Sequence, residues 1–327
     1  MDAFHRPCPV CGGVDRFYLI ANPRNGGAPY WRCRQCDHTD PAGTLPGFDA
    51  DRHDPPPTID PGTREAIYRC YDIVAQMCVE RLWSSDGRRA LAYLRQRGLT
   101  PETLRTLRIG WSGAGDDLLT DLWRREIGRL PVDRCTYSTS SSYDVALLGG
   151  LRFPGGAHPR GVLRGCVTLP YYANGRCVWL RGRKLAPRPG EPRYFAPAGP
   201  AFAGGAPRFY LHDLLHDHAE LLLTEGELKC LLAHQEWRAG RSLHPCIAVP
   251  GAAFLPPDLA AALRGATVHL AFDTDASGAG QRLALRAAEK LRLAGAAVRI
   301  ITLPLPAGKA KADLDSFILE ETTHATH

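Results

Sequence analysis

Short apolar runs alternate with helix-like segments over the last third of the chain, and no other feature constrains the fold as strongly. We expect strands at 220–224, 246–249, 268–272 and 298–303, with helices at 226–237, 257–264 and 280–293 between them. This alternation predicts a mostly parallel sheet with helices packed on it, because parallel neighbours need a long crossover. Ligands of such sheets bind at the carboxyl ends of the strands.

Acidic residues follow three of these strands. Glu225 comes directly after the first, Asp273 and Asp275 follow the third, and Asp313 and Asp315 come after the last. The carboxyl ends of parallel strands share one edge, so these groups are expected to converge, and clustered carboxylates repel unless cations neutralise them. Their oxygens suit Mg²⁺ or Mn²⁺, and two such ions support nucleotidyl transfer. A single aspartate, such as Asp275, has the alternative of a helix cap or a turn.

Four cysteines near the amino terminus form two Cys-x-x-Cys pairs, Cys8/Cys11 and Cys33/Cys36. This spacing predicts one structural zinc ion in a ribbon, with strands at 16–20 and 30–32 between the pairs. The alternative of unrelated redox thiols does not explain the paired spacing.

Aromatic residues of the ribbon, Trp31 among them, lie between arginines such as Arg32. This mixture suits single-stranded nucleic acid, because bases stack on rings and phosphates meet guanidinium groups. The alternative for each ring is a place in the small core of the ribbon.

Two stretches in the middle of the chain differ in composition from their surroundings. A Pro- and Gly-rich stretch at 41–62 predicts a linker, and helices are expected at 63–83, at 87–97 and from Thr100 onward. The stretch 145–190 contains no acidic residue and eight basic ones, which predicts a polyanion-binding surface. Short strands are expected within it at 162–163, 166–169 and 178–180.

The whole-chain composition is that of a globular protein, with 327 residues and a formal net charge of +6. The sequence has no long apolar run and no apolar leader at its start, so we expect neither a membrane span nor export. The expected location is the cytoplasm, at the nucleoid.

The motifs Glu225-Gly226 and Asp273-Thr-Asp-Ala-Ser-Gly278 resemble those of the Toprim domain, and the segments upstream resemble the core of DnaG-type primases. The ribbon resembles those of phage and plasmid primases. The basic motif is matched at 167–184, and Arg193-Tyr-Phe matches the short segment after it. The resemblance implies a zinc ribbon at 1–45, a linker at 46–62, a basic subdomain at 63–218, a Toprim domain at 219–320 and a tail at 321–327. The implied fold is α/β, or α+β overall.

The resemblance implies that the chain makes RNA primers on single-stranded DNA from ribonucleoside triphosphates, for a mobile element and with a helicase supplied in trans. Glu225, Asp273 and Asp275 would be catalytic. Asp273, Asp275, Asp313 and Asp315 would hold two or more Mg²⁺ or Mn²⁺ ions. The residues expected to bind template or nucleotide are Arg181, Arg183, Lys184, Arg193, Lys229, Trp31 and Arg32.

Lys229 departs from the family pattern, which has an acid there, and so puts the number of metal ions in doubt. Two other functions use the same residues: a metal-dependent Toprim nuclease, and an inactive zinc-ribbon protein that binds single strands.

Overall fold

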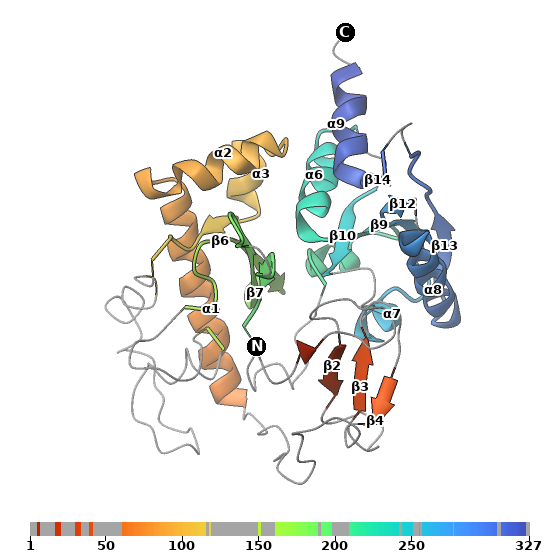
Figure 1. Cartoon of the computed structure of the whole chain (residues 1–327), viewed down its shortest axis with the longest axis horizontal. Coiled ribbons are helices and arrows are strands. Elements are labelled where there is room, and N and C mark those ends of the chain that lie inside the picture. The colour runs from red at the N-terminus through yellow and green to blue at the C-terminus, as the bar shows by residue number, and fades with distance from the viewer. Residues whose placement is uncertain are drawn as a thin grey trace. The chain divides into compact units, whose positions relative to one another are not determined.

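The computed structural model describes residues 5–6, 17–20, 30–33, 39–41, 61–115, 118, 150–151, 161–188, 191–197, 209–241, 244–250, 255, 257–276, 278–305 and 309–324. The chain divides into two compact units, Met1–Pro57 and Thr58–His327 (Figure 1). No helix in the described ranges is long and apolar enough to cross a membrane.

The first unit contains a four-stranded antiparallel sheet of β1 (His5–Arg6), β2 (Phe17–Ile20), β3 (Tyr30–Cys33) and β4 (Thr39–Pro41), in that order. Cys33 is the last residue of β3 and pairs with Phe17. Cys8, Cys11 and Cys36 lie outside the described residues, so the zinc site stays a prediction.

Three helices open the second unit: α1 (Pro61–Leu82), α2 (Arg88–Gln96) and α3 (Pro101–Thr106). A short 3-10 turn, η3 (Ser85–Gly87), joins the first two. The hydroxyl of Thr100 accepts the backbone N–H of Thr103 at 3.2 Å, and Pro101 occupies the first helical position. The cap sets the start of this helix at the Thr100-Pro101 step, where the sequence predicted a helix to begin.

An antiparallel sheet follows, with β5 (Gly110–Trp111), β6 (Cys166–Ala173), β7 (Arg176–Lys184) and β8 (Tyr194–Phe195) in sequence order. Asn174 and Gly175 join β6 to β7 with φ of 53° and 73°, as a tight hairpin turn requires. The Asp213 carboxylate in the 3-10 helix η6 (His212–His216) accepts both of their N–H groups. The predicted strand at 162–163 is wrong: these residues form a turn that ends at Gly165, with φ of 69°.

The parallel sheet has the order β10-β9-β11-β13, and every pair in it is parallel, as predicted. Its strands are β9 (Glu220–Glu225), β10 (Cys246–Val249), β11 (Thr267–Ala271) and β13 (Ala297–Ile300). Alternate side chains of these strands pack on α6 (Glu227–Arg238) on one face, and on α7 (Pro257–Ala262) and α8 (Ala279–Leu293) on the other. The last elements are β12 (Thr274–Asp275), β14 (Lys311–Ala312) and α9 (Leu314–His324).

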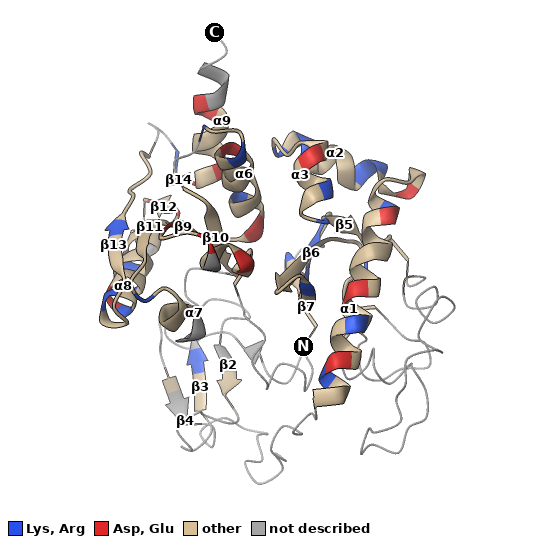
Figure 2. Ribbon diagram, turned by 180° about the vertical axis from the view of Figure 1, so that it is seen from behind, with Lys and Arg blue, Asp and Glu red and all other residues tan. Residues whose placement is uncertain are grey.

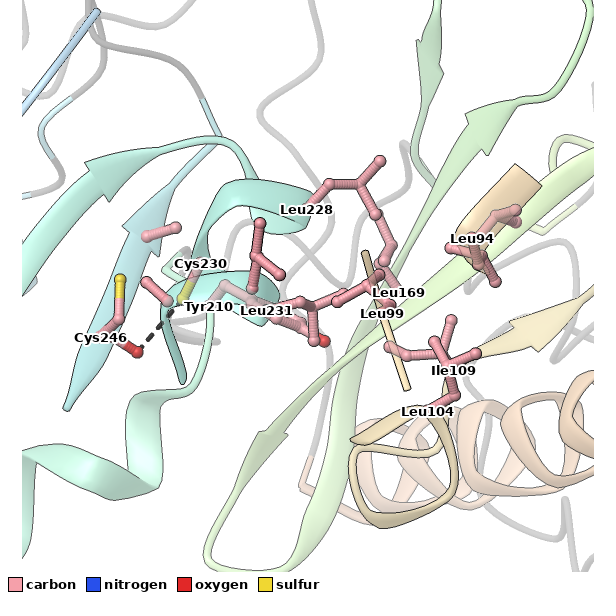
Figure 3. Packing of buried hydrophobic residues seen from close by; sticks show 14 of the residues in the cluster. Leu94, Leu99, Leu104, Ile109, Leu169, Tyr210, Leu228, Cys230, Leu231 and Cys246 are labelled. Carbon is pink, nitrogen blue, oxygen red and sulfur yellow. Dashed lines mark hydrogen bonds between the residues drawn. The ribbon is translucent and has the colours of Figure 1, made fainter. Parts of the chain in front are cut away.

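One apolar cluster spans both halves of the second unit. Leu228 and Leu231 of α6 belong to the same cluster as Leu169 of β6, Leu104 of α3 and Tyr210 (Figure 3). The antiparallel and parallel sheets therefore share a core, which fixes the basic hairpin relative to the acidic edge of the parallel sheet. The predicted α/β fold, α+β overall, is confirmed.

Candidate active site

Glu225 and Asp273 lie at the carboxyl edge of the parallel sheet, as their places after β9 and β11 predicted. Glu225 is the last residue of β9, and Asp273 follows β11 by two residues. The neighbouring pair Thr224 and Ala271 is in register, so both acids leave the sheet at the same level. The Asp273 side chain is only 5% exposed. A carboxylate this deeply buried requires charged or hydrogen-bonding partners.

Two lysines are the charged partners of the Asp273 carboxylate. Lys229, one turn into α6, pairs with Asp273 Oδ1 and lies 3.5 Å from Glu225 Oε1. Lys311 of β14 places its Nζ 2.5 Å from Asp273 Oδ2. Lys229, predicted to bind nucleic acid or nucleotide, is therefore engaged with the acids of the site.

The pKa values of the Glu225 and Asp273 carboxyl groups are shifted in opposite directions. Burial, followed by hydrogen bonding and repulsion from Asp273, raises the pKa of Glu225 to about 7. Burial also opposes ionisation of Asp273, but hydrogen bonding with Glu225 and the charge of Lys229 outweigh it and lower the pKa of Asp273. Glu225 is thus the group that holds or releases a proton near neutral pH, while Asp273 stays ionised.

Asp275 lies in β12, between the sheet edge and the start of α8. Its Oδ2 accepts the backbone N–H of Gly280 at 2.7 Å, so it caps this helix, which is the structural alternative that the sequence left open. Gly278 has φ of 69°, a conformation that favours glycine. A Cβ on Gly280 would lie 1.9 Å from the Asp273 carbonyl oxygen. Both glycines therefore shape the loop that carries Asp273.

Asp313 and Asp315 reach the site by a route that the sequence did not predict. They follow β14 rather than β13, and β14 pairs antiparallel with β12. Asp313 Oδ1 accepts the hydroxyl of Ser316 at 2.6 Å, near the start of α9. Asp315 forms an ion pair with Arg97, at the end of α2.

The pKa values of Asp313 and Asp315 are also shifted in opposite directions. Burial opposes ionisation of Asp313, but hydrogen bonds with Ser316 and Asp315 lower its pKa overall. Burial and hydrogen bonding with Asp313 raise the pKa of Asp315. Each acidic pair at this edge thus contains one carboxyl group that ionises readily and one that resists ionisation.

The basic strand β7 reaches the same edge of the sheet. Arg181 donates to Glu227 Oε1 at 2.6 Å and to the carbonyl oxygen of Pro250, the residue after β10, at 3.0 Å. Figure 2 shows basic residues on β7 and acidic ones at the start of α6, on elements that face each other. The structure therefore brings the predicted basic and acidic segments together.

The other predicted basic residues differ in their surroundings. Arg183 lies between two phenols, donating to Tyr93 at 2.6 Å and Tyr194 at 3.1 Å. Lys184 lies 3.1 Å from Glu191. Arg193 is exposed beside them, and its carbonyl accepts the N–H of Lys184.

In the first unit, Arg32 is half-buried and Trp31 is buried, at 1% exposed. For Trp31 this burial favours the alternative of a core ring over a base-stacking surface. The nucleic-acid roles predicted for both residues stay predictions.

Glu227 is a site residue that the sequence reasoning missed. It is fully buried, and its Oε1 accepts bonds from both Arg181 and the Tyr171 hydroxyl at 2.6 Å. The signal was present in the sequence, because an acid two residues after Glu225 lies in the first turn of the following helix. Only the tertiary structure shows that this acid turns toward β7 and not toward Asp273.

The donor set has the chemistry of a site for a hard divalent cation, although no three of its carboxylates bring ligand atoms within 4.8 Å of one another. Five acids lie along this edge (Glu225, Asp273, Asp275, Asp313 and Asp315), against three cationic partners (Lys229, Lys311 and Arg97). Carboxylate oxygens are the ligands that Mg²⁺ and Mn²⁺ prefer.

Comparison with known proteins gives two kinds of likeness. No family model matches the chain. The chain is 30% identical over 227 residues to a DNA primase of Geobacillus stearothermophilus, a match that covers 68% of this chain and 34% of that protein. The chain thus spans about a third of the length of this relative.

Solved structures extend the likeness to the fold. The DnaG primase catalytic domain bound to single-stranded DNA superposes with a TM-score of 0.63 at 22% identity, covering 82% of this chain and 78% of that one. The zinc-binding and RNA polymerase domains of Aquifex aeolicus primase give 0.62 at 17% identity, covering 98% and 76%. The RNA polymerase domain of Mycobacterium tuberculosis DnaG gives 0.60 at 19% identity, covering 81% and 82%.

Fold and site together define a mixed α+β core, with acids at the edge of a parallel sheet beside a basic strand. The fold is that of the DnaG-type primase core.

Proposed function

We propose that this chain synthesises RNA primers on single-stranded DNA by template-directed nucleotidyl transfer. The observation that carries the proposal is the contact of Arg181 with Glu227 and Pro250, because it sets the basic strand β7 against the acidic edge of the parallel sheet. A nucleotidyl transferase needs this juxtaposition: cations for the polyanionic template and triphosphate, and carboxylates at the reacting phosphate. The likeness to a DNA primase and to primase catalytic domains supports the same reaction.

In this reaction a 3′-hydroxyl oxygen forms a bond to the α-phosphorus of a ribonucleoside triphosphate, the α–β phosphoanhydride bond breaks, and pyrophosphate leaves. Glu225 is suited to take the hydroxyl proton, since its pKa of about 7 lies near the working pH. Asp273, with Asp275, Asp313 and Asp315 beside it, would hold Mg²⁺ or Mn²⁺, which neutralises phosphate charge when bound. Arg183, Lys184 and Arg193 would bind template or triphosphate.

The same proposal assigns the first unit to template reading. Cys8, Cys11, Cys33 and Cys36 would hold one structural zinc ion, and Arg32 would contact the template. The chain would act at the nucleoid on behalf of a mobile element, with a helicase supplied by another protein. The predicted domain boundaries at 45, 62, 218 and 320 belong to this proposal too.

Primer synthesis on mixed-sequence single-stranded DNA, with labelled ribonucleotides and Mg²⁺ or Mn²⁺, tests the proposal. We expect short RNA products from the parent, a loss of at least about a hundredfold in Asp273→Asn, and loss of initiation alone in Cys33→Ala. Glu289→Gln, an exposed acid on α8, is the matched control and should be unaffected. Circular dichroism would show that each variant is folded.

Two other outcomes would replace the proposal. Cleavage of the DNA without RNA synthesis would make the chain a metal-dependent nuclease. Binding of single strands with neither reaction would make it a binding protein.

A further inference from the structure

Three side chains with metal-binding atoms meet at the amino edge of the parallel sheet, opposite the edge that carries the acids. Glu220 opens β9, and His269 belongs to β11. His244 precedes β10 by two residues, and the register Cys246↔Leu222 continued toward the amino edge sets it beside Glu220. His269 pairs with Leu222, two residues from Glu220, so the alternation of side chains puts all three on the same face.

The ligand atoms of these residues are close together. Glu220 Oε2 lies 3.5 Å from His244 Nδ1 and 3.4 Å from His269 Nε2, and the ligand atoms of all three lie within 4.8 Å of one another. In the described part of the chain, no other group of three His, Cys or acidic residues meets that condition. His269 is buried, His244 half-buried and Glu220 exposed, so the cluster is open to solvent on one side.

These distances suit a first-row transition ion. Bonds of about 2.1 Å to a tetrahedral Zn²⁺ place neighbouring ligand atoms about 3.4 Å apart, which is the separation of Glu220 from each histidine. Two imidazoles and one carboxylate form a donor set typical of zinc sites with an open position, whereas Mg²⁺ prefers oxygen alone.

Two features of the cluster oppose metal binding. The rings of His244 and His269 stack at 4.0 Å with 17° between their planes, so their lone pairs run nearly parallel and one ring must turn for both to reach one ion. Arg299 of β13 pairs with His269 of β11 in the register of the sheet, so a cationic residue lies in the strand next to the cluster. A positive charge there repels a metal ion and so opposes its binding.

We propose that Glu220, His244 and His269 form a binding site for a divalent transition-metal ion of the Zn²⁺ class. The site lies at the far end of β9 from Glu225, about 16 Å away along the strand. Primer synthesis as proposed above uses none of its residues. A bound ion would join β9, β10 and β11 at the edge of the sheet where Glu220, His244 and His269 lie.

Cobalt substitution in the full chain tests the site, because Co²⁺ bound by nitrogen and oxygen gives visible bands without the thiolate charge-transfer band of a cysteine site. We expect His269→Gln and Glu220→Gln to remove the visible bands of Co²⁺ bound by nitrogen and oxygen. We expect Cys33→Ala to remove the thiolate charge-transfer band. Metal analysis should find one equivalent of Zn²⁺ fewer in His269→Gln than in the parent. His218→Gln is the matched control and should keep the parent's content.

Affinity and stability give independent readouts. We expect Zn²⁺ affinity at this site to fall by more than roughly tenfold in either triad variant. At a hundredfold excess of Zn²⁺ over its dissociation constant, the thermal midpoint of the parent should exceed that of His269→Gln by about 5 °C. Equal metal content and equal spectra in the parent and in a folded His269→Gln would show that the cluster is only a hydrogen-bonded group, and would overturn the proposal.

Discussion

Single residues at the acidic edge act through the charge that they place beside a buried neighbour. Lys229 illustrates this, because it pairs with both Asp273 and Glu225. A cation at this position lowers the pKa of Glu225 against the opposing effects of burial and Asp273. Lys229 therefore tunes the pKa of the proposed base.

The pH dependence of the proposed primer synthesis follows from this arrangement. We expect the rate to rise with pH through an apparent pKa near 7 as Glu225 loses its proton. Lys229→Gln removes a charge that lowers this pKa, so the rising limb should move to higher pH. Lys290→Gln, on the exposed side of α8, is the control. An unchanged profile in Lys229→Gln would exclude Glu225 as the titrating group.

His234 predicts a separate effect of acid on stability. Burial, and then the charge of Arg238, lower its folded pKa from 6.5 to about 4. The unfolded chain therefore binds the extra proton first, and stability is lost as pH falls from 6.5 to 4, by about 3 kcal/mol at most. Glu225 acts with the opposite sign in this window, so the informative quantity is the difference between parent and His234→Gln. Urea denaturation at pH 4.5 and 7.5 should show a smaller acid loss in the variant.

At the scale of elements, the sequence predicted the helices and strands that have a clear spacing of apolar residues or a recognisable helix start. The strands 246–249 and 220–224 and the helix that starts at Pro101 lie where expected to within a residue. Two-residue strands such as β12 and β14 are too short to show an alternation of apolar residues, so the sequence did not predict them. Their pairing is what delivers Lys311 and Asp313 to the site, so the route of the last acids was unpredictable from local pattern.

The loop between β11 and α8 predicts a sharp glycine requirement. In Gly280→Ala the new Cβ would lie 1.9 Å from the Asp273 carbonyl oxygen, so the loop must move. We expect a loss of about 2 kcal/mol in stability and at least a tenfold loss in primer synthesis. Gly240→Ala is the matched control: its φ of 73° gives a strain of about 1–2 kcal/mol, but its surroundings are open and far from the acids in sequence. Full activity in Gly280→Ala would contradict this account.

At the scale of the whole second unit, one buried ion pair joins its two halves. Arg181 of β7 and Glu227 of α6 meet at 2.6 Å, with Glu227 fully buried. The resemblance to DnaG-type primases implied that Arg181, which lies in a basic run, binds template or nucleotide. The structure shows that its guanidinium is mostly enclosed, between Glu227 and the Tyr194 ring 4.3 Å away. A run of like charges does not reveal which member turns inward.

A double-mutant cycle measures this junction. Arg181→Met leaves the Glu227 carboxylate buried without its cation, and we expect a loss of about 3–5 kcal/mol in the free energy of unfolding. Glu227→Gln in the same chain should restore much of that loss, because a neutral amide can keep the bond to Tyr171. Additive effects of the two changes would mean that the pair does not couple the halves.

This junction also limits how such a protein can change by recombination. A crossover between residues 181 and 227 would join the basic half of one parent to the acidic half of another. The product loses stability unless both parents carry matching residues at these two positions, because either one alone is a buried charge without a counterpart. The two halves are therefore expected to be inherited together, as one evolutionary module, although each contains its own sheet.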